Sequence, residues 1–307
     1  MITVDRKLAE RKPDVMAYFR ERAAETMSET RRRFGESQFK DRASHINKAS
    51  TEAYRQVVEG VRAKSAAESW DSEEQLSALL MLNYANAVVM VETRNEVWPY
   101  DYMTFSRRIG ELWQPFCKLC FEYPVSTVQP VIPPLFKDVK LALANEVEAY
   151  ISELPISAAQ HIELKAYYDK VWALVNSGEI NLALDLHFQF DSTQFAVDFK
   201  SAFGSNEKGN TNRLLLVASI YRAFDKDSRC LLWVRAEEDQ NNAYFRTLQR
   251  SGIWEAFCGD ETYDQISHYS GFNLREWMRS NVDWLTDLDT STAKHIVDSG
   301  LGRYVEW

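Results

Sequence analysis

The sequence predicts a protein of the α/β (α+β) class, in which a large helical N-terminal region precedes a region that carries a β-hairpin. Two observations predict this organisation. Up to about residue 177, apolar residues recur at helical spacing, between residues that commonly start or end helices. From Glu179 the spacing changes to two, and the order that follows is strand, strand, loop, helix, strand, with more helices after it.

The first half of the chain is expected to form successive helices. Pro13 suits the first turn of a helix, and Gly35 suits the position just after its end. Ser72 and Gln75 resemble a capping box at the start of a long apolar helix. Pro115 is expected to kink or interrupt a later helix. The expected helices cover residues 13–35, 50–64, 72–95, 102 onward, 134–153 and 157–177.

A boundary between two regions is expected near residue 130. The chain has 307 residues, enough for one large domain or two modest ones. It contains eight prolines, and half of them lie between residues 124 and 134, where one regular segment gives way to the next. We therefore divide the chain into a helical region, residues 1–130, and a second region, residues 131–307.

The charge is unevenly distributed. The net charge of −9 speaks against nucleic-acid binding through bulk charge alone. Residues 1–64, however, carry 15 Lys and Arg against 10 Asp and Glu, whereas the rest carries 21 against 35. Local patches decide where phosphates bind, and carboxylates that hold a metal ion add negative charge that the ion offsets. The acidic composition is therefore compatible with a DNA-binding protein.

The sequence predicts a cytoplasmic protein without a membrane segment. The N-terminus is charged from Asp5 onward, which is unlike a signal peptide. The longest apolar stretch, residues 76–91, is too short and too polar to cross a bilayer and is expected to be a buried helix. Only two of the four cysteines, Cys117 and Cys120, are close together, which favours reduced thiols over a disulfide framework.

The hairpin is expected to gather charged side chains on one face. Residues 179–190 and 195–203 alternate between apolar and other side chains, and 191–194 are expected to form the turn. With that turn, Asp185 faces Lys200 and His187 faces Asp198, all on one side of the sheet. A shift of one residue would move the charged set to the opposite face. Two carboxylates and an ammonium are thus expected at one place.

This set suits phosphodiester hydrolysis. Asp185, Asp198 and the backbone carbonyl of Phe199 offer hard oxygen ligands of the kind that Mg²⁺ prefers. The ion would polarise the phosphate and acidify the attacking water. Lys200 would position that water or stabilise the developing negative charge.

The residues Asp185 and Asp198-Phe199-Lys200, thirteen positions apart on a predicted hairpin, resemble the signature of the PD-(D/E)XK nuclease superfamily. A helix before the hairpin and a helix and strand after it also match that superfamily, over about residues 157–236. Leu184 stands where proline often precedes the first acid. The resemblance is greatest to type II restriction endonucleases.

The resemblance implies a mixed central β-sheet flanked by helices, a restriction-endonuclease-like core, within a catalytic domain at residues 131–307. It also implies a Mg²⁺-dependent homodimer that cuts double-stranded DNA at a specific sequence. The helical region 1–130 would then serve dimerisation, DNA contacts or both.

The loop after the hairpin is a candidate DNA contact. Short polar side chains and glycines allow a close approach to phosphates, and asparagine and arginine can read base edges. The segment also begins a helix, whose free amides favour an anion. The candidate residues are Ser205, Asn206, Lys208, Asn210, Asn212 and Arg213. His187 is a possible extra base, and Glu163, on the helix before the hairpin, is a possible further acid.

Each assignment has a simpler alternative. The hairpin alone is compatible with a salt-bridged solvent face, the loop with a plain connection, and His187 and Glu163 with ordinary surface positions. Cys117-x-x-Cys120 has zinc-like spacing but no second pair. Alternative functions are a repair or structure-specific nuclease of the same fold, and a non-catalytic helical interaction protein. Activity on branched DNA alone would favour the first, and absence of metal binding the second.

Overall fold

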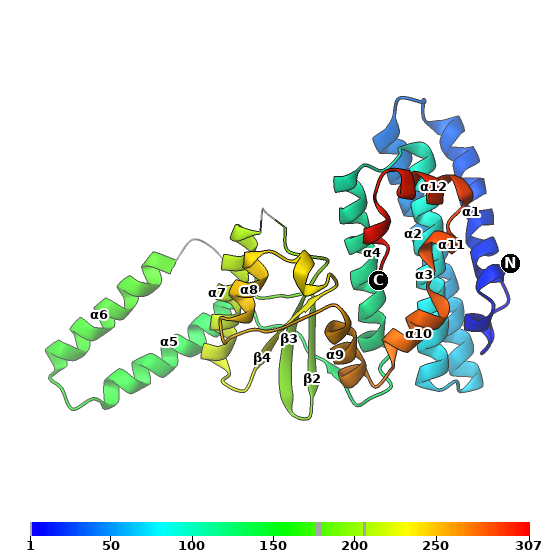
Figure 1. The fold of residues 1–307 in the computed structure, drawn as a ribbon. Helices are drawn as coiled ribbons and strands as arrows, with labels where there is room; N and C mark the ends of the chain where they lie inside the picture. Colours follow the sequence, from blue (N-terminus) through cyan, green and yellow to red (C-terminus); the bar gives the residue numbers. More distant parts are fainter. Residues whose placement is uncertain (1, 176–179, 205–206) are drawn as a thin grey trace. The chain divides into compact units, whose positions relative to one another are not determined.

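The computed structural model describes residues 2–175, 180–204 and 207–307, which form two compact units (Figure 1). Unit 1 comprises Met1–Val128 and Gly259–Trp307, and unit 2 comprises Gln129–Cys258. Unit 2 contains the β-sheet, and the described part of unit 1 consists of helices and their connections. The protein is therefore of the expected mixed α+β class, with a five-stranded mixed sheet and helices.

Unit 1 is built around one long apolar helix, α3, which packs against α1, α2 and α4. Among the described helices, α3 alone has the length and hydropathy of a membrane span, and most of it is buried inside the protein. Such burial is typical of a core helix. The helices of unit 1 are α1 (Lys12–Arg33), α2 (Phe39–Glu68), α3 (Ser72–Val97), α4 (Tyr102–Glu122), α9 (Asp260–Ser270), α10 (Leu274–Asn281), α11 (Trp284–Asp287) and α12 (Thr290–Asp298), with 3₁₀ turns at Leu8–Glu10 and Gly302–Tyr304.

Residues 259–307 belong to unit 1, although the sequence-based division assigned them to the second region. The cause is long-range packing that no local pattern reveals. The Trp113 indole donates a hydrogen bond to the Tyr263 hydroxyl at 3.0 Å. The Tyr84 hydroxyl donates to Asp287 at 2.6 Å, and Lys12 pairs with the same carboxylate at 2.8 Å.

Three features of the helices differ from the expectations. Helix α2 begins at Phe39, well before the expected residue 50. The capping box of α3 is formed by Asp71 and Glu74, one residue earlier than predicted, because each side chain accepts the other's backbone amide. Helix α4 continues through Pro115 without a break in its assigned span.

Unit 2 is an open sheet of five strands in the order β1-β2-β3-β4-β5. The first three strands are antiparallel, whereas β3, β4 and β5 run parallel. The strands are β1 (Gln129–Pro130), β2 (Leu186–Phe190), β3 (Thr193–Lys200), β4 (Arg229–Val234) and β5 (Glu255–Cys258). The helices are α5 (Phe136–Glu153), α6 (Ala158–Val175), α7 (Lys208–Phe224) and α8 (Ala243–Gln249), with a 3₁₀ turn at Glu238–Gln240. The sequence did not predict β1 or β5, and the expected first strand begins only at residue 186.

The core of unit 2 lies between the sheet and helices α5 and α7. Val217 and Ala218 of α7 pack in one buried cluster with Ala196 of β3 and Leu232 of β4, and Val139 of α5 joins it. The opposite face of the sheet is also buried, since Phe188 and Phe195 stack 4.9 Å apart with at most 4% of either side chain exposed. Both faces of the hairpin therefore carry buried side chains, so neither is an open solvent face.

The turn between β2 and β3 is shorter than predicted. Asp191 and Ser192 form a two-residue turn with φ values of 46° and 68°, and Phe190 pairs with Thr193. Such left-handed pairs match the twist of a hairpin, so two residues suffice where four were expected. The predicted register is thus wrong by two residues. Because the shift is even, every side chain keeps its predicted face.

Candidate active site

The corrected register brings the two predicted carboxylates opposite each other. Leu186 pairs with Val197, so the preceding residue, Asp185, lies opposite Asp198 rather than Lys200. The Phe199 amide donates a hydrogen bond to Asp185 Oδ2 at 2.8 Å, which fixes this carboxylate beside β3. The structure thus gathers the residues that the sequence predicted, in a different pairing.

Asp198 is the buried centre of this cluster. Its side chain is 3% exposed, and Lys200 Nζ lies 2.6 Å from its Oδ2 atom. On the other side, Arg213 Nη2 lies 3.6 Å from Oδ1. Burial raises the pKa of Asp198 above its usual value, Lys200 and Arg213 oppose the rise, and the charge of Asp185 adds to it. Burial thus disfavours the charged form of Asp198 more than its two basic neighbours favour it.

Helix α7 supplies the second cation of the cluster. Arg213 lies in its first two turns, and its Nε donates to Asn210 Oδ1 at 3.4 Å. Asn210 in turn donates to Glu207 at 3.0 Å, at the start of the helix. The sequence placed these residues in a loop after the hairpin, whereas α7 already begins at Lys208.

The candidate DNA contacts are accordingly distributed along a helix start. Lys208, Asn210, Asn212 and Arg213 lie on the first turns of α7, and the side chains of Lys208 and Asn212 are exposed. Ser205 and Asn206 fall outside the described residues. Only Arg213 of this set contacts the carboxylate cluster among the described residues.

His187 has a different strand partner than predicted, and Glu163 lies at an exposed position. His187 pairs with Ala196 rather than Asp198, and its Nε2 accepts a hydrogen bond from the Leu184 amide at 2.9 Å. It therefore holds the backbone immediately before Asp185. Glu163 is exposed on α6, and its side chain makes no ion pair or hydrogen bond with the described part of the chain.

Three residues that the sequence analysis missed support the end of β3. The Asn241 side chain accepts from the Phe203 amide at 2.8 Å and donates to the carbonyl groups of Ala236 and Glu237. Asn242 donates to the Gly204 carbonyl. Arg235, buried directly after β4, donates its amide to the Lys200 carbonyl at 2.9 Å. The adjacent Asn241 and Asn242 could have been recognised as a helix-capping signal before α8. Their partners Phe203 and Gly204, however, are 38 residues away in the sequence.

The donor set fits a hard divalent cation. Asp198 Oδ2 has no hydrogen bond of acceptable angle among the described residues, despite its contact with Lys200. The Phe199 amide points to Asp185, and the carbonyl of the same strand residue points to the same side. Among the described residues, no three or more His, Cys, Asp or Glu side chains are grouped so that they alone could hold a metal ion. A Mg²⁺ ion held here would complete its shell with water and phosphate oxygens.

Zinc at the paired cysteines is disfavoured. Cys117 and Cys120 are both fully buried in α4, and neither forms a disulfide. Burial raises the pKa of the Cys120 thiol, whereas zinc needs a thiolate.

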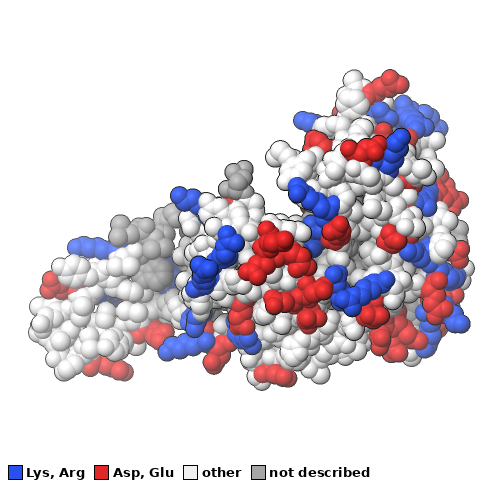
Figure 2. Space-filling view, in the orientation of Figure 1, with Lys and Arg blue, Asp and Glu red and all other residues white. Residues whose placement is uncertain are grey.

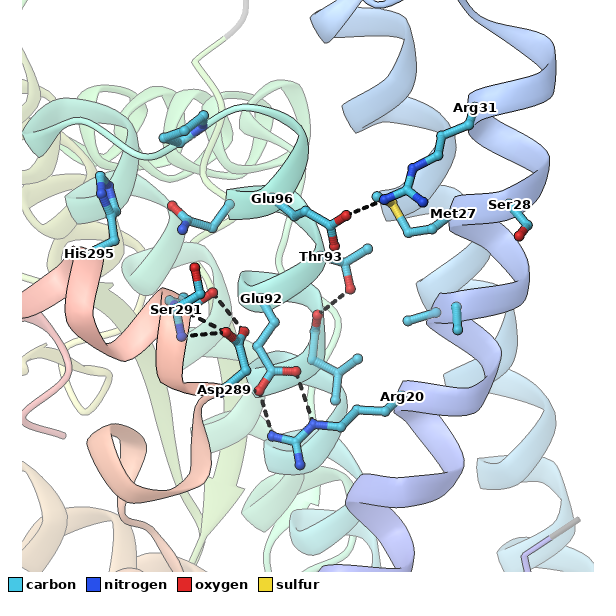
Figure 3. Close-up of a pocket in the computed structure, with 16 residues that line it drawn as sticks. Arg20, Met27, Ser28, Arg31, Glu92, Thr93, Glu96, Asp289, Ser291 and His295 are labelled. Atoms are coloured by element: carbon cyan, nitrogen blue, oxygen red, sulfur yellow. Dashed lines mark hydrogen bonds and ion pairs between the residues drawn. The ribbon is translucent and has the colours of Figure 1, made fainter.

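A cavity of about 860 Å³ lies elsewhere, between α1, α3 and α12 of unit 1 (Figure 3). Its two arginines are paired with its two glutamates, and Asp289 accepts hydrogen bonds from the Ser291 and Thr292 amides. Arg20 makes two hydrogen bonds to Glu92, of 2.6 and 3.1 Å, and Arg31 pairs with Glu96 at 2.5 Å. The hairpin, with its buried Asp198 of raised pKa, is the stronger candidate for chemistry.

Comparison with protein-family models, curated proteins and solved structures found no match.

Proposed function

We propose that the protein is a Mg²⁺-dependent endonuclease that cuts double-stranded DNA at a specific sequence, as type II restriction endonucleases do. The observation that carries this proposal is the convergence of Asp185, Asp198 and Lys200 at one end of the β2–β3 hairpin. A buried carboxylate with a raised pKa, close to a second carboxylate and an ammonium, is typical of a functional site.

The sheet around the cluster supports a restriction-endonuclease-like core. An antiparallel hairpin is followed by a helix, α7, and then by a strand parallel to β3. The resemblance of the sequence to PD-(D/E)XK nucleases rests in part on this same order of hairpin, helix and strand. The core would lie in unit 2, with the helical unit 1 joined to it by two chain connections.

The side chains have distinct roles in the proposed reaction. Asp185 and Asp198 would hold the cation, together with the carbonyl of Phe199; when bound, the ion would acidify water and polarise the scissile phosphate. Lys200, 22% exposed, would orient the attacking water and offset charge that develops on the phosphate. Arg213, 40% exposed, would bind a phosphate oxygen through the guanidinium N–H groups that are not directed at Asp198.

DNA binding would rest on local contacts. On the face drawn in Figure 2, basic and acidic side chains are intermixed. The start of α7 provides exposed Lys208 and Asn212 close in sequence to Arg213. Free amides at this helix start would favour a phosphate.

The proposal is tested by cleavage of duplex DNA by four variants. Asp185→Asn, Asp198→Ala and Lys200→Ala should each lower the rate by at least about a hundredfold, the scale on which positioned charges contribute to catalysis. Asp227→Asn, an exposed carboxylate on the α7–β4 connection, is the matched control and should cut at the wild-type rate. Equal rates for all four variants would refute the assignment.

A further inference from the structure

The cavity between α1, α3 and α12 is not used by the proposed cleavage chemistry (Figure 3). Every residue that lines it belongs to unit 1, so its walls do not depend on unit 2. Its volume of about 860 Å³ lies within the range of about 300–1,000 Å³ that is usual for small-molecule sites. The cavity is therefore large enough to hold a small organic molecule.

The charged side chains of the lining are already committed within the protein. The Glu92 carboxylate accepts two hydrogen bonds from Arg20 and a third from the Asp289 amide, at 2.7 Å. Arg31 pairs with Glu96, and the Asp289 carboxylate accepts from backbone amides at the start of α12. With two arginines against three carboxylates, the lining has no surplus positive charge for an anion. A neutral ligand suits such a lining.

Asn95 provides an uncommitted hydrogen-bond donor. Its side chain is buried, with 7% exposed, and its Oδ1 accepts from the Tyr100 amide at 3.0 Å. Because only the oxygen can accept that bond, the orientation of the side-chain amide is fixed, and Nδ2 carries the two N–H groups. Within the described residues, no atom accepts a hydrogen bond from this Nδ2. A ligand atom that accepts there would satisfy a buried donor.

His295 provides the matching acceptor, and the same residue fixes it. Its Nε2 lies 2.8 Å from the Tyr100 carbonyl oxygen, which can only accept, so Nε2 carries the proton. In the neutral ring Nδ1 then keeps its lone pair. No group in the described part of the chain donates to this Nδ1. Tyr100 thus holds a donor through its N–H group and an acceptor through its carbonyl, and both side chains line the cavity.

We propose that the cavity binds a neutral nucleoside through the edge of its base. Each nucleobase carries a hydrogen-bond acceptor beside an N–H donor on its Watson–Crick edge. The acceptor would receive a hydrogen bond from Asn95 Nδ2, and the donor would give one to His295 Nδ1. Apolar side chains suited to the faces of a planar ring complete the lining: Ala23, Ala24, Met27, Val89 and Pro99. This inference does not depend on the nuclease assignment.

Isothermal titration calorimetry of the full chain, without DNA or metal, tests the proposal with adenosine, cytidine, guanosine and uridine in turn. At least one should bind with a Kd of about 0.1 mM, the affinity typical of a ligand of this size. Asn95→Asp keeps the acceptor for the Tyr100 amide but replaces the free donor with an oxygen. It should weaken binding at least about tenfold. Asn83→Asp, the same change on α3 outside the lining, is the control and should leave the Kd unchanged.

Two ligand comparisons test the proposal without any change to the protein. Methylation of the N–H group on the base edge removes the donor to His295 and should also weaken binding about tenfold. The 5′-monophosphate should bind no more tightly than the nucleoside, because the arginines are already paired. A monophosphate that binds about tenfold more tightly would make the cavity an anion site and overturn the inference.

Absence of binding by all four nucleosides at about 1 mM would also overturn it, as would equal affinity of Asn95→Asp and the wild type. Circular dichroism of each variant separates loss of binding from loss of fold. The two proposals fail separately, because binding is measured without DNA or metal. A chain that binds a nucleoside but leaves DNA intact contradicts only the nuclease assignment, and one that cuts DNA but binds no nucleoside contradicts only this inference.

Discussion

Replacing Ser192 with glycine should stabilise the hairpin that carries the carboxylate cluster. Ser192 has a φ of 68°, a conformation that costs a residue with a Cβ atom about 1–2 kcal/mol. Glycine removes this cost but loses about 0.5–1 kcal/mol through greater freedom in the unfolded chain. The net gain in the free energy of unfolding is therefore about 0.5–1 kcal/mol. On the usual scale this raises Tm by about 1–4 °C.

Thermal unfolding followed by circular dichroism measures this change. Thr193→Gly is the matched control, because Thr193 begins β3 and has no positive φ. Its replacement should lower Tm, since it removes a β-branched side chain from a strand. Cleavage by Ser192→Gly should be unchanged, because the register is kept. If Ser192→Gly lowered Tm as much as the control, the two-residue left-handed turn, and the register derived from it, would be wrong.

Three further predictions concern the site and unit 1. Asp198→Asn should raise the free energy of unfolding of the metal-free protein at neutral pH. Because burial raises the pKa of Asp198, its contribution favours folding below about pH 4 and is lost as pH rises through the raised pKa. Denaturant titrations of variant and wild type should therefore differ at pH 7.5 and not at pH 3.5. Mg²⁺ at a hundred times its Kd should stabilise the wild type by about 2.7 kcal/mol, and calorimetric scans should show no such gain for Asp185→Asn. Gly271→Ala should destabilise unit 1 by about 1–3 kcal/mol in urea titrations, because φ is +75° and the new Cβ would lie 3.0 Å from the Ser126 amide nitrogen. Gly252→Ala is the control and should destabilise the protein less, because Gly252 has a positive φ but open space around it.

The faces of the hairpin were predictable from the sequence, but its register was not. Alternation with period two places Asp185, Asp198 and Lys200 on one side of the sheet whatever the even shift. The register depends on the turn, and Asp191-Ser192 lacks the glycine that usually marks a two-residue hairpin turn. The predicted pairing of Asp185 with Lys200 was therefore wrong by two residues.

Features that depend on long-range packing could not be predicted. The burial of Asp198 results from α7 and α5 covering its face of the sheet, and no local pattern gives that. The membership of residues 259–307 in unit 1 depends on contacts such as that of Tyr263 with Trp113, 150 residues apart. Strands β1 and β5, of two and four residues, are too short to show a period.

The most direct test of the central claim is incubation of the purified protein with long duplex DNA, in Mg²⁺ and in EDTA, followed by electrophoresis. The nuclease assignment predicts discrete fragments with Mg²⁺, intact DNA with EDTA, and intact DNA with Asp198→Ala under both conditions. Discrete fragments from Asp198→Ala, or intact DNA from the wild type with Mg²⁺ at every salt concentration, would contradict it.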